Sequence, residues 1–468
     1  MMLKTKKILS SGSKRSTTCQ KIWPLLVRRK KKLMEPRLTE LHPVDSQGER
    51  PVLRNGFLSE HSLSTSNNDP ESFHCAIAPV LVLAQLFGIL PVSGLLQLTP
   101  SKLRFAKFSP RTAYTTFITT MVLVMAILSN IHMIRTLNST TFEVQGGIAA
   151  ATAGAVFYSN SMIGLIIFFW LSPRWVILQR DWRVMEQFID SNKATRPKLR
   201  WKLYAMSVTI LLLAVIEHVL SIAVNSEKYD WSGTANSTFQ NFLNVYCNSS
   251  HAFILETLRY NLALGIFIFI VSKLSTFTWN FIDLFIMMVS TGLAERYKTL
   301  NKQVTTSVSK HRAIDWSRVR EDYAALTCMV KKVDADIAPI ILLSFANNLY
   351  FICLQLLNGL SQPDDSSLLS NIYFFGSFAF LIGRTILVTL FASRVNDQSR
   401  VVLPALYTCS ASAYNIETER LMMQITTDDV ALTGMRFFSV TRNFMLAVAG
   451  AIVTYEVVLL QFNVSMKK

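Results

Sequence analysis

The strongest constraint on the fold is a series of apolar runs, each about as long as a membrane is thick. A helix rises about 1.5 Å per residue, so about twenty apolar residues cross a hydrocarbon layer of about 30 Å. Half of the 468 residues are apolar and only 16% are charged. The sequence therefore predicts an all-α, polytopic membrane protein with seven transmembrane helices. The spans are expected at about 112–136, 148–172, 202–224, 255–290, 338–359, 368–393 and 441–462.

The connections between these spans alternate in charge. Residues 101–111 have four basic residues and no acid, and the loops at 173–201 and 295–335 are also rich in Lys and Arg. Cytoplasmic loops have an excess of Lys and Arg, so these three loops are placed inside. Two of the other loops contain N-glycosylation sequons, which are used only on the extracytoplasmic side. The loop at 361–367 has two Asp and no basic residue. The sequon asparagines are Asn138, Asn236, Asn248 and, after the last span, Asn463.

These signals agree on a cytosolic N-terminus and an extracellular C-terminus. Residues 1–72 are predicted to be a disordered, basic cytosolic tail, with eleven Lys or Arg and no acid before Leu33. The apolar segment 73–97 would place that tail outside if it crossed the membrane. We therefore predict that 73–97 is an interfacial or re-entrant helix. The net charge of +17 is assigned to this tail and the inner loops, where it meets membrane lipids and not nucleic acid.

A helical platform is expected on the cytosolic side. Helical periodicity continues from the fourth span past residue 290 without a proline. Residues 295–337 and the segment 394–440 also alternate apolar and charged residues at helical spacing. We expect these segments to pack together below the membrane, which leaves 112–393 as a six-helix sensing domain.

The chain contains no motif that indicates catalysis. The six cysteines show no paired spacing, so neither a disulfide framework nor a metal site is expected. Phosphate-binding loops and nucleophile motifs are also missing from the sequence. We therefore predict that the protein is not an enzyme and needs no cofactor.

Polar side chains recur in the predicted outer halves of the first six spans. Such groups are costly at membrane depth unless they satisfy one another or face a cavity. Amides, carboxylates and aromatics around an apolar cleft suit a small polyhydroxylated ligand. The alternative is an interhelical hydrogen-bond network without a ligand. The candidate ligand-binding residues are His132, Tyr158, Asn160, Glu217, His218, Glu256, Arg259, Asn347, Asn348, Tyr350, Gln355, Tyr373 and Phe374.

The last span, 441–462, differs from an ordinary anchor. Small residues fill its first half, and over such residues helices approach closely. Thr454 and Gln461 lie seven residues apart and share a face, while Glu456 points away from it. This pattern is compatible with a pore-lining helix or with a buried helix of the bundle.

The end of this span resembles the signature of the insect gustatory receptors. Thr454 and Tyr455, five further residues, then Gln461 and Phe462 reproduce that family's TY-five-QF motif. The likeness, closest to the sugar-sensing branch, covers roughly 75–463. It is clearest in AQLFGILPVSG (84–94), TFTWNFIDLFIMMVSTGLAERY (276–297), SFANNLYFICLQLLNGL (344–360), FFGSFAFLIGRTILVTLFASRVND (374–397) and FFSVTRNFMLAVAGAIVTYEVVLLQF (437–462).

The resemblance implies a plasma-membrane, ligand-gated, non-selective cation channel that forms a homotetramer or a heterotetramer with related receptors. A mono- or disaccharide is expected in the outer halves of the first six spans, and the last helix is expected to line a central pore. The pore and gate candidates are Thr454, Val457, Val458, Leu460 and Gln461. A seven-helix receptor that signals through a G protein and a sugar carrier are the alternatives.

Overall fold

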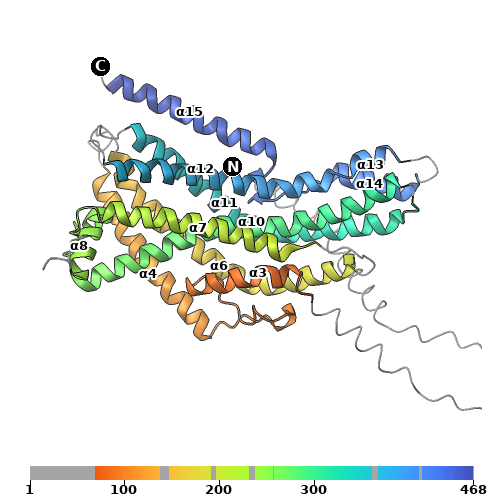
Figure 1. The fold of residues 1–468 in the computed structure, drawn as a ribbon, viewed down its shortest axis with the longest axis horizontal. Helices are drawn as coiled ribbons and strands as arrows, with labels where there is room; N and C mark the ends of the chain where they lie inside the picture. Colours follow the sequence, from red (N-terminus) through yellow and green to blue (C-terminus); the bar gives the residue numbers. More distant parts are fainter. Residues whose placement is uncertain are drawn as a thin grey trace, which may run out of the picture.

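The computed structural model describes residues 69–137, 147–190, 197–230, 238–256, 258–310, 312–360, 367–409 and 414–466. This part of the chain is a bundle of long helices with one short antiparallel β-ribbon (Figure 1). The elements are α3 (Phe73–Leu86), the 3₁₀ turn η1 (Pro100–Lys102), α4 (Pro110–Thr136), α6 (Gly147–Asp190), α7 (Leu199–Asn225), α8 (Phe239–Ser250), α9 (Ala252–Leu255), α10 (Leu262–Ser309), α11 (Trp316–Leu360), α12 (Leu368–Arg400), α13 (Leu403–Tyr407), α14 (Ile416–Thr427), β1 (Thr433–Gly434), β2 (Phe438–Ser439) and α15 (Arg442–Met466).

Six helices are long and apolar enough to cross a membrane, among the residues that the structure describes. They are Pro110–Thr136, Ala151–Asp190, Leu199–Asn225, Leu262–Ser309, Trp316–Gly359 and Leu368–Tyr407. Six predicted spans are thereby confirmed as helices of sufficient length. The predicted seventh span forms α15, a helix of 25 residues, and its crossing remains a prediction.

The predicted start of the fourth span was wrong. The sequence placed it at 255, whereas α10 begins at Leu262. The side chain of Asn261 accepts a hydrogen bond from the Leu264 N–H at 2.8 Å and so caps the helix. Glu256 and Arg259 consequently lie in the connection between α9 and α10 and not on a spanning helix.

The predicted platform helices pack together. Helices α10 and α11 contain 48 and 45 residues, more than one bilayer crossing requires. Their extensions lie beside α13 and α14 at the right-hand end of Figure 1. Arg320 of α11 pairs with Glu417 of α14 at 2.5 Å, and hydrogen bonds from Arg320 and Arg420 lower the pKa of Glu417. A second pair joins Lys331 to Asp428 at 2.8 Å.

Helix α3 is a short helix, and its interfacial or re-entrant position in the membrane remains a prediction. It has 14 residues, and the Ser72 side chain caps its first turn. Its Phe73 is buried and stacks on Trp182 of α6, with the ring centroids 3.9 Å apart. Beyond α3 the chain turns at Gly88, whose φ of +76° favours glycine, and forms a hairpin over residues 87–109.

Buried charges fix the start of α3 against the bundle. The Phe73 N–H donates to Glu186 at 3.0 Å, and Glu186 also pairs with Arg296 of α10 at 2.8 Å. Arg296 makes a second ion pair with Asp190 at 2.8 Å, and Asp69 lies 3.6 Å from Arg183. Buried charges persist in folded proteins when they are paired in this way.

The packing of α3 against α10 and α6 can be tested by a substitution at Gly292 of α10. A Cβ added there would lie 2.6 Å from the Phe73 ring and 3.0 Å from Trp182, so Gly292→Ala forces the stacked rings apart. We expect a loss of about 1–3 kcal/mol of unfolding free energy from this overpacking. The apparent melting temperature in detergent, read by fluorescence-detected gel filtration, measures it.

Gly383→Ala in α12 is the matched control. No atom lies within 4 Å of its added Cβ, so the change is expected to be neutral or stabilising by roughly 0.5–1 kcal/mol. Equal melting temperatures for the two variants would contradict the described position of α3.

Candidate ligand site

A buried ion pair lies at the centre of the bundle. Arg384 Nε of α12 is 2.8 Å from Asp283 Oδ2 of α10, and the two side chains are only 2% and 0% exposed. Ser344 and Asn348 of α11 both donate hydrogen bonds to the Asp283 carboxylate. Arg384 donates to Asn280 and Asn348 in turn. Three helices are therefore joined through one pair of charges.

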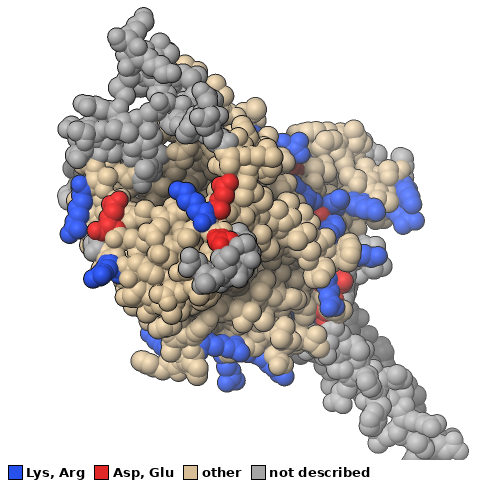
Figure 2. All heavy atoms as spheres, turned by 60° about the vertical axis from the view of Figure 1, so that its left-hand side comes forward, with Lys and Arg blue, Asp and Glu red and all other residues tan. Residues whose placement is uncertain are grey.

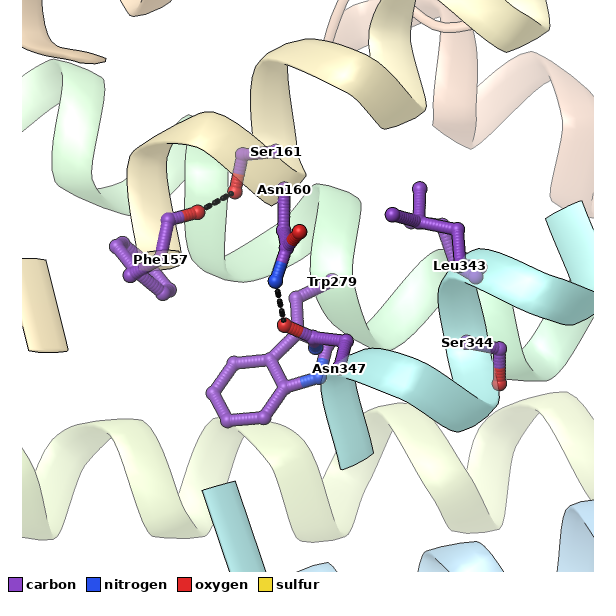
Figure 3. Close-up of a pocket in the computed structure, with 8 residues that line it drawn as sticks. Phe157, Asn160, Ser161, Trp279, Leu343, Ser344 and Asn347 are labelled. Carbon is purple, nitrogen blue, oxygen red and sulfur yellow. Dashed lines mark hydrogen bonds between the residues drawn. The ribbon is translucent and has the colours of Figure 1, made fainter. Parts of the chain in front are cut away.

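A second polar contact lies beside this pair and joins α6 to α11. Asn160 Nδ2 donates to Asn347 Oδ1 at 2.6 Å, and Figure 3 shows the Trp279 indole next to Asn347. The Trp279 Nε1–H donates to Asn348 at 3.3 Å, and its ring lies 4.6 Å from the Arg384 guanidinium. The cavity here measures about 10 Å³, which is room for a water molecule and not for a sugar. Its lining consists of Phe157, Asn160, Ser161, Trp279, Ile282, Leu343, Ser344 and Asn347.

A polar group between α7, α11 and α12 brings together three of the predicted ligand residues. Glu217 of α7 lies near Ser377 of α12, whose hydroxyl oxygen accepts a hydrogen bond from Gln355 of α11 at 3.3 Å. Tyr373 contacts Ser377 as well. Amide, hydroxyl and carboxylate groups of this kind can pair with the donors and acceptors of a hydroxylated ligand.

A third group lies around His251, between α8 and α9. Tyr158 OH lies 2.6 Å from His251 Nε2, and Ser250 Oγ lies 2.6 Å from the other ring nitrogen. Burial, and to a smaller extent Lys273, lowers the pKa of His251 to about 3, so its imidazole is neutral. Lys273 Nζ donates to Tyr246 OH at 2.8 Å. The Lys273 charge also reaches His218, whose buried Nε2 has no hydrogen-bond partner among the described residues.

The other predicted ligand residues lie apart from these groups. His132 is 3.5 Å from the mostly exposed Glu256, and Arg259 is exposed. Tyr350 OH bonds to Thr152 Oγ1 at 2.7 Å, and Phe374 stacks on Phe378. The predicted set is thus divided among several places and does not line one cavity.

Sequence reasoning missed four charged or titratable residues in these groups, which are Asp283, Arg384, Lys273 and His251. The first three are isolated ionisable residues within long apolar helices. An ionisable residue in a membrane span is by itself a reason to suspect a functional site, so this signal was present in the sequence.

Helix α15 stands away from the bundle (Figure 1). The N-terminal end of α15 packs against α11 and α12. No described side chain between Arg442 and Val458 is buried. Thr454 donates to the Gly450 carbonyl oxygen within the helix, and Val457 and Val458 are exposed. The side chains of the other two pore candidates, Leu460 and Gln461, lie outside the described residues.

One of the four predicted glycosylation residues can be placed with its side chain. Asn248 is exposed on α8, where its amide bonds to Asn244. Asn138, Asn236 and the Asn463 side chain lie outside the described residues, and so does the predicted tail up to residue 68.

Known proteins with similar sequences share one class. A family model for the Trehalose receptor matches residues 46–468. The chain is 33% identical over 399 residues to the Drosophila melanogaster gustatory receptor for sugar taste 64f, a match that covers 84% of this chain and 81% of that protein. It is also 33% identical over 401 residues to the Drosophila melanogaster gustatory receptor 5a for trehalose, with 85% and 86% covered.

The fold is also found in solved structures. The insect olfactory receptor OR5 from Machilis hrabei superposes with a TM-score of 0.57 over 82% of this chain and 97% of that chain, at 13% identity. The same receptor in complex with eugenol gives a TM-score of 0.55.

A multi-pass plasma-membrane receptor is the class that this helical bundle and these relatives define. The chain belongs to the Trehalose receptor family, the sugar-sensing branch of the insect gustatory receptors. This is a family of receptors and not of enzymes.

Substitutions at Asp283 and Arg384 test whether each buried charge is stabilised by the other. Asp283→Asn leaves the Arg384 guanidinium buried without a counter-charge and is expected to cost about 3–5 kcal/mol of unfolding free energy. Combining it with Arg384→Met removes both charges and should restore part of that loss. Apparent melting temperatures of the single and double variants measure the coupling, and additive losses would contradict it.

Proposed function

We propose that this protein is a subunit of a sugar-gated, non-selective cation channel. Its named relatives are gustatory receptors for sugar taste and for trehalose, and its helices, apolar runs and loop charges suit seven crossings with the N-terminus inside. In this proposal a sugar binds among the outer halves of α4, α6, α7, α10, α11 and α12. The chain assembles as a homotetramer or a heterotetramer with related receptors, and α15 of each subunit lines a central pore.

The observation that carries the pore proposal is the exposure of α15 on opposite faces. Val453 and Tyr455 are two residues apart, which separates them by about 200° around a helix, and both are exposed. A helix that its own bundle leaves uncovered on opposite faces is free to pack against other subunits around a pore. Gly450 and its neighbouring alanines suit close approach, since no atom lies within 4 Å of a Cβ added at Gly450.

The polar groups of the bundle suit a sugar only after the helices separate. The cavity beside Asn160 and Asn347 holds about 10 Å³, so a sugar must break or replace their hydrogen bond. A ligand shifts the equilibrium toward a wider conformation by its higher affinity for that conformation. We propose that Glu217, Tyr373 and Gln355 contact the sugar from the opposite helices.

A route from this region to the pore helix runs through α11. Ser344 bonds to Asp283 in the polar network, and the next residue, Phe345, packs against Phe444 of α15 with the ring centroids 5.1 Å apart. Phe444 also stacks on Phe438 at 4.4 Å. A sugar that shifts α11 would therefore also move the N-terminal end of α15.

Channel activity separates this proposal from its alternatives. The chain expressed alone, or with a related receptor, should give sugar-evoked cation currents in excised patches without GTP. Currents that require GTP would favour a G-protein-coupled receptor, and uptake of labelled sugar without current would favour a carrier.

Glu217→Gln tests the sugar contact. The change keeps the size of the side chain and removes a charged acceptor, for which we expect at least a tenfold increase in the sugar concentration that gives half-maximal current. Glu227→Gln is the matched control, because that carboxylate is exposed near the outer end of α7. The same response in both variants would contradict a ligand role for Glu217.

Gln461→Ala tests the pore face. This residue is the first of the QF pair in the TY-five-QF motif, and it lies on the same helix face as Thr454. We expect altered permeability ratios or open probability in single-channel records, with unchanged protein at the cell surface. Wild-type currents from this variant would place the permeation path elsewhere.

A further inference from the structure

The 87–109 hairpin and the start of α4 form a surface with basic side chains and no acidic ones. Residues 72–136 contain no Asp or Glu. Five basic side chains within this stretch are exposed, and four of them, Lys102, Arg104, Lys107 and Arg111, lie on the hairpin and at the start of α4. Figure 2 shows basic side chains along the lower edge of the molecule, where the hairpin lies in Figure 1.

The hairpin holds these side chains on a fixed backbone. Ser93 and Arg104 exchange two backbone hydrogen bonds of 2.8 and 3.1 Å. Leu103 is fully buried, and its carbonyl oxygen accepts a 3.0 Å hydrogen bond from Arg180 of α6. With Leu103 directed into the core, its neighbours Lys102 and Arg104 remain exposed.

Apolar side chains border the basic ones. Phe108 is fully exposed between Lys107 and the start of α4. Tyr114 and Phe117 are exposed on α4, and Tyr114 OH donates to the Leu86 carbonyl oxygen at 2.7 Å. The exposed apolar face of this candidate span therefore continues to the hairpin, where the basic residues begin. Apolar contact with acyl chains next to cationic contact with headgroups is the chemistry of a lipid interface.

We propose that the hairpin binds the phosphate headgroups of anionic phospholipids, with Lys102, Arg104 and Lys107 as the cationic contacts and Phe108 placed among the acyl chains. Arg111 instead supports the hairpin, since its guanidinium donates to the Val92 carbonyl oxygen at 3.0 Å. Under the proposed topology the lipid belongs to the inner leaflet. The site does not depend on sugar gating.

Lipid selectivity of the full chain tests this site. The protein is reconstituted into phosphatidylcholine nanodiscs that contain spin-labelled phosphatidylserine or spin-labelled phosphatidylcholine, and the association of each probe is compared. The wild type should prefer phosphatidylserine, and the preference should fall at high salt. The triple variant Lys102→Gln, Arg104→Gln, Lys107→Gln should lose about tenfold or more of it.

The matched control is Lys298→Gln, Lys302→Gln, Lys310→Gln, which removes the same charge from exposed positions on α10 and at its C-cap. It should keep the preference, as should Lys102→Arg with Lys107→Arg, which retains the charge. Phe108→Ser should weaken the association of both probes.

Three results would overturn the proposal. They are an unchanged preference in the triple glutamine variant, an equal loss in the α10 control, and full displacement of the lipid probe by the water-soluble headgroup glycerophosphoserine. Melting temperatures check folding, and should the triple variant fail to fold, the salt dependence of the wild type and Phe108→Ser still decide the outcome.

Discussion

The bundle depends on one pair of opposite charges that water does not reach. Asp283 and Arg384 are costly to bury, and each is tolerated because the other is in place. The pair orients Asn280, Ser344 and Asn348, and these amides and hydroxyls then determine how α11 meets α10 and α12. A network of hydrogen bonds around a buried ion pair favours one arrangement of helices, and any ligand that enters nearby must compete with it.

The positions of the apolar helices were predictable, because apolar runs and capping residues are local features, but α6 continues past its predicted end at 172 to Asp190. Ser72 and Asn261 begin their helices through side-chain caps that can be read from a few residues, although the second was overlooked and the fourth span was started too early. The meeting of Asp283 with Arg384 was not predictable in this way. The two are 101 positions apart, and helical spacing gives the face of each residue on its own helix but not the rotation of that helix in the bundle.

The same limit explains the predicted ligand residues. Asn160 and Asn347 do meet, and so do residues around Glu217, because these side chains point inward from neighbouring helices. Arg259 and Glu256 were included on the assumption of an unbroken helix, and the structure places them in a connection. His251 was passed over since it lies outside any apolar run, yet α8 and α9 fold it back against Tyr158.

The unbroken course of α10 has a mechanical consequence. A helix of 48 residues is about 72 Å long, more than twice the thickness of the hydrocarbon layer. It contains Lys273 near one end, Asp283 farther along, and Glu295 and Arg296 toward the other, and it has no proline at which to bend. A long helix without a bend moves as one stiff unit. A small tilt at one membrane surface displaces its far end by a larger distance, so the helices packed against that end are moved even when the change around the ligand is slight.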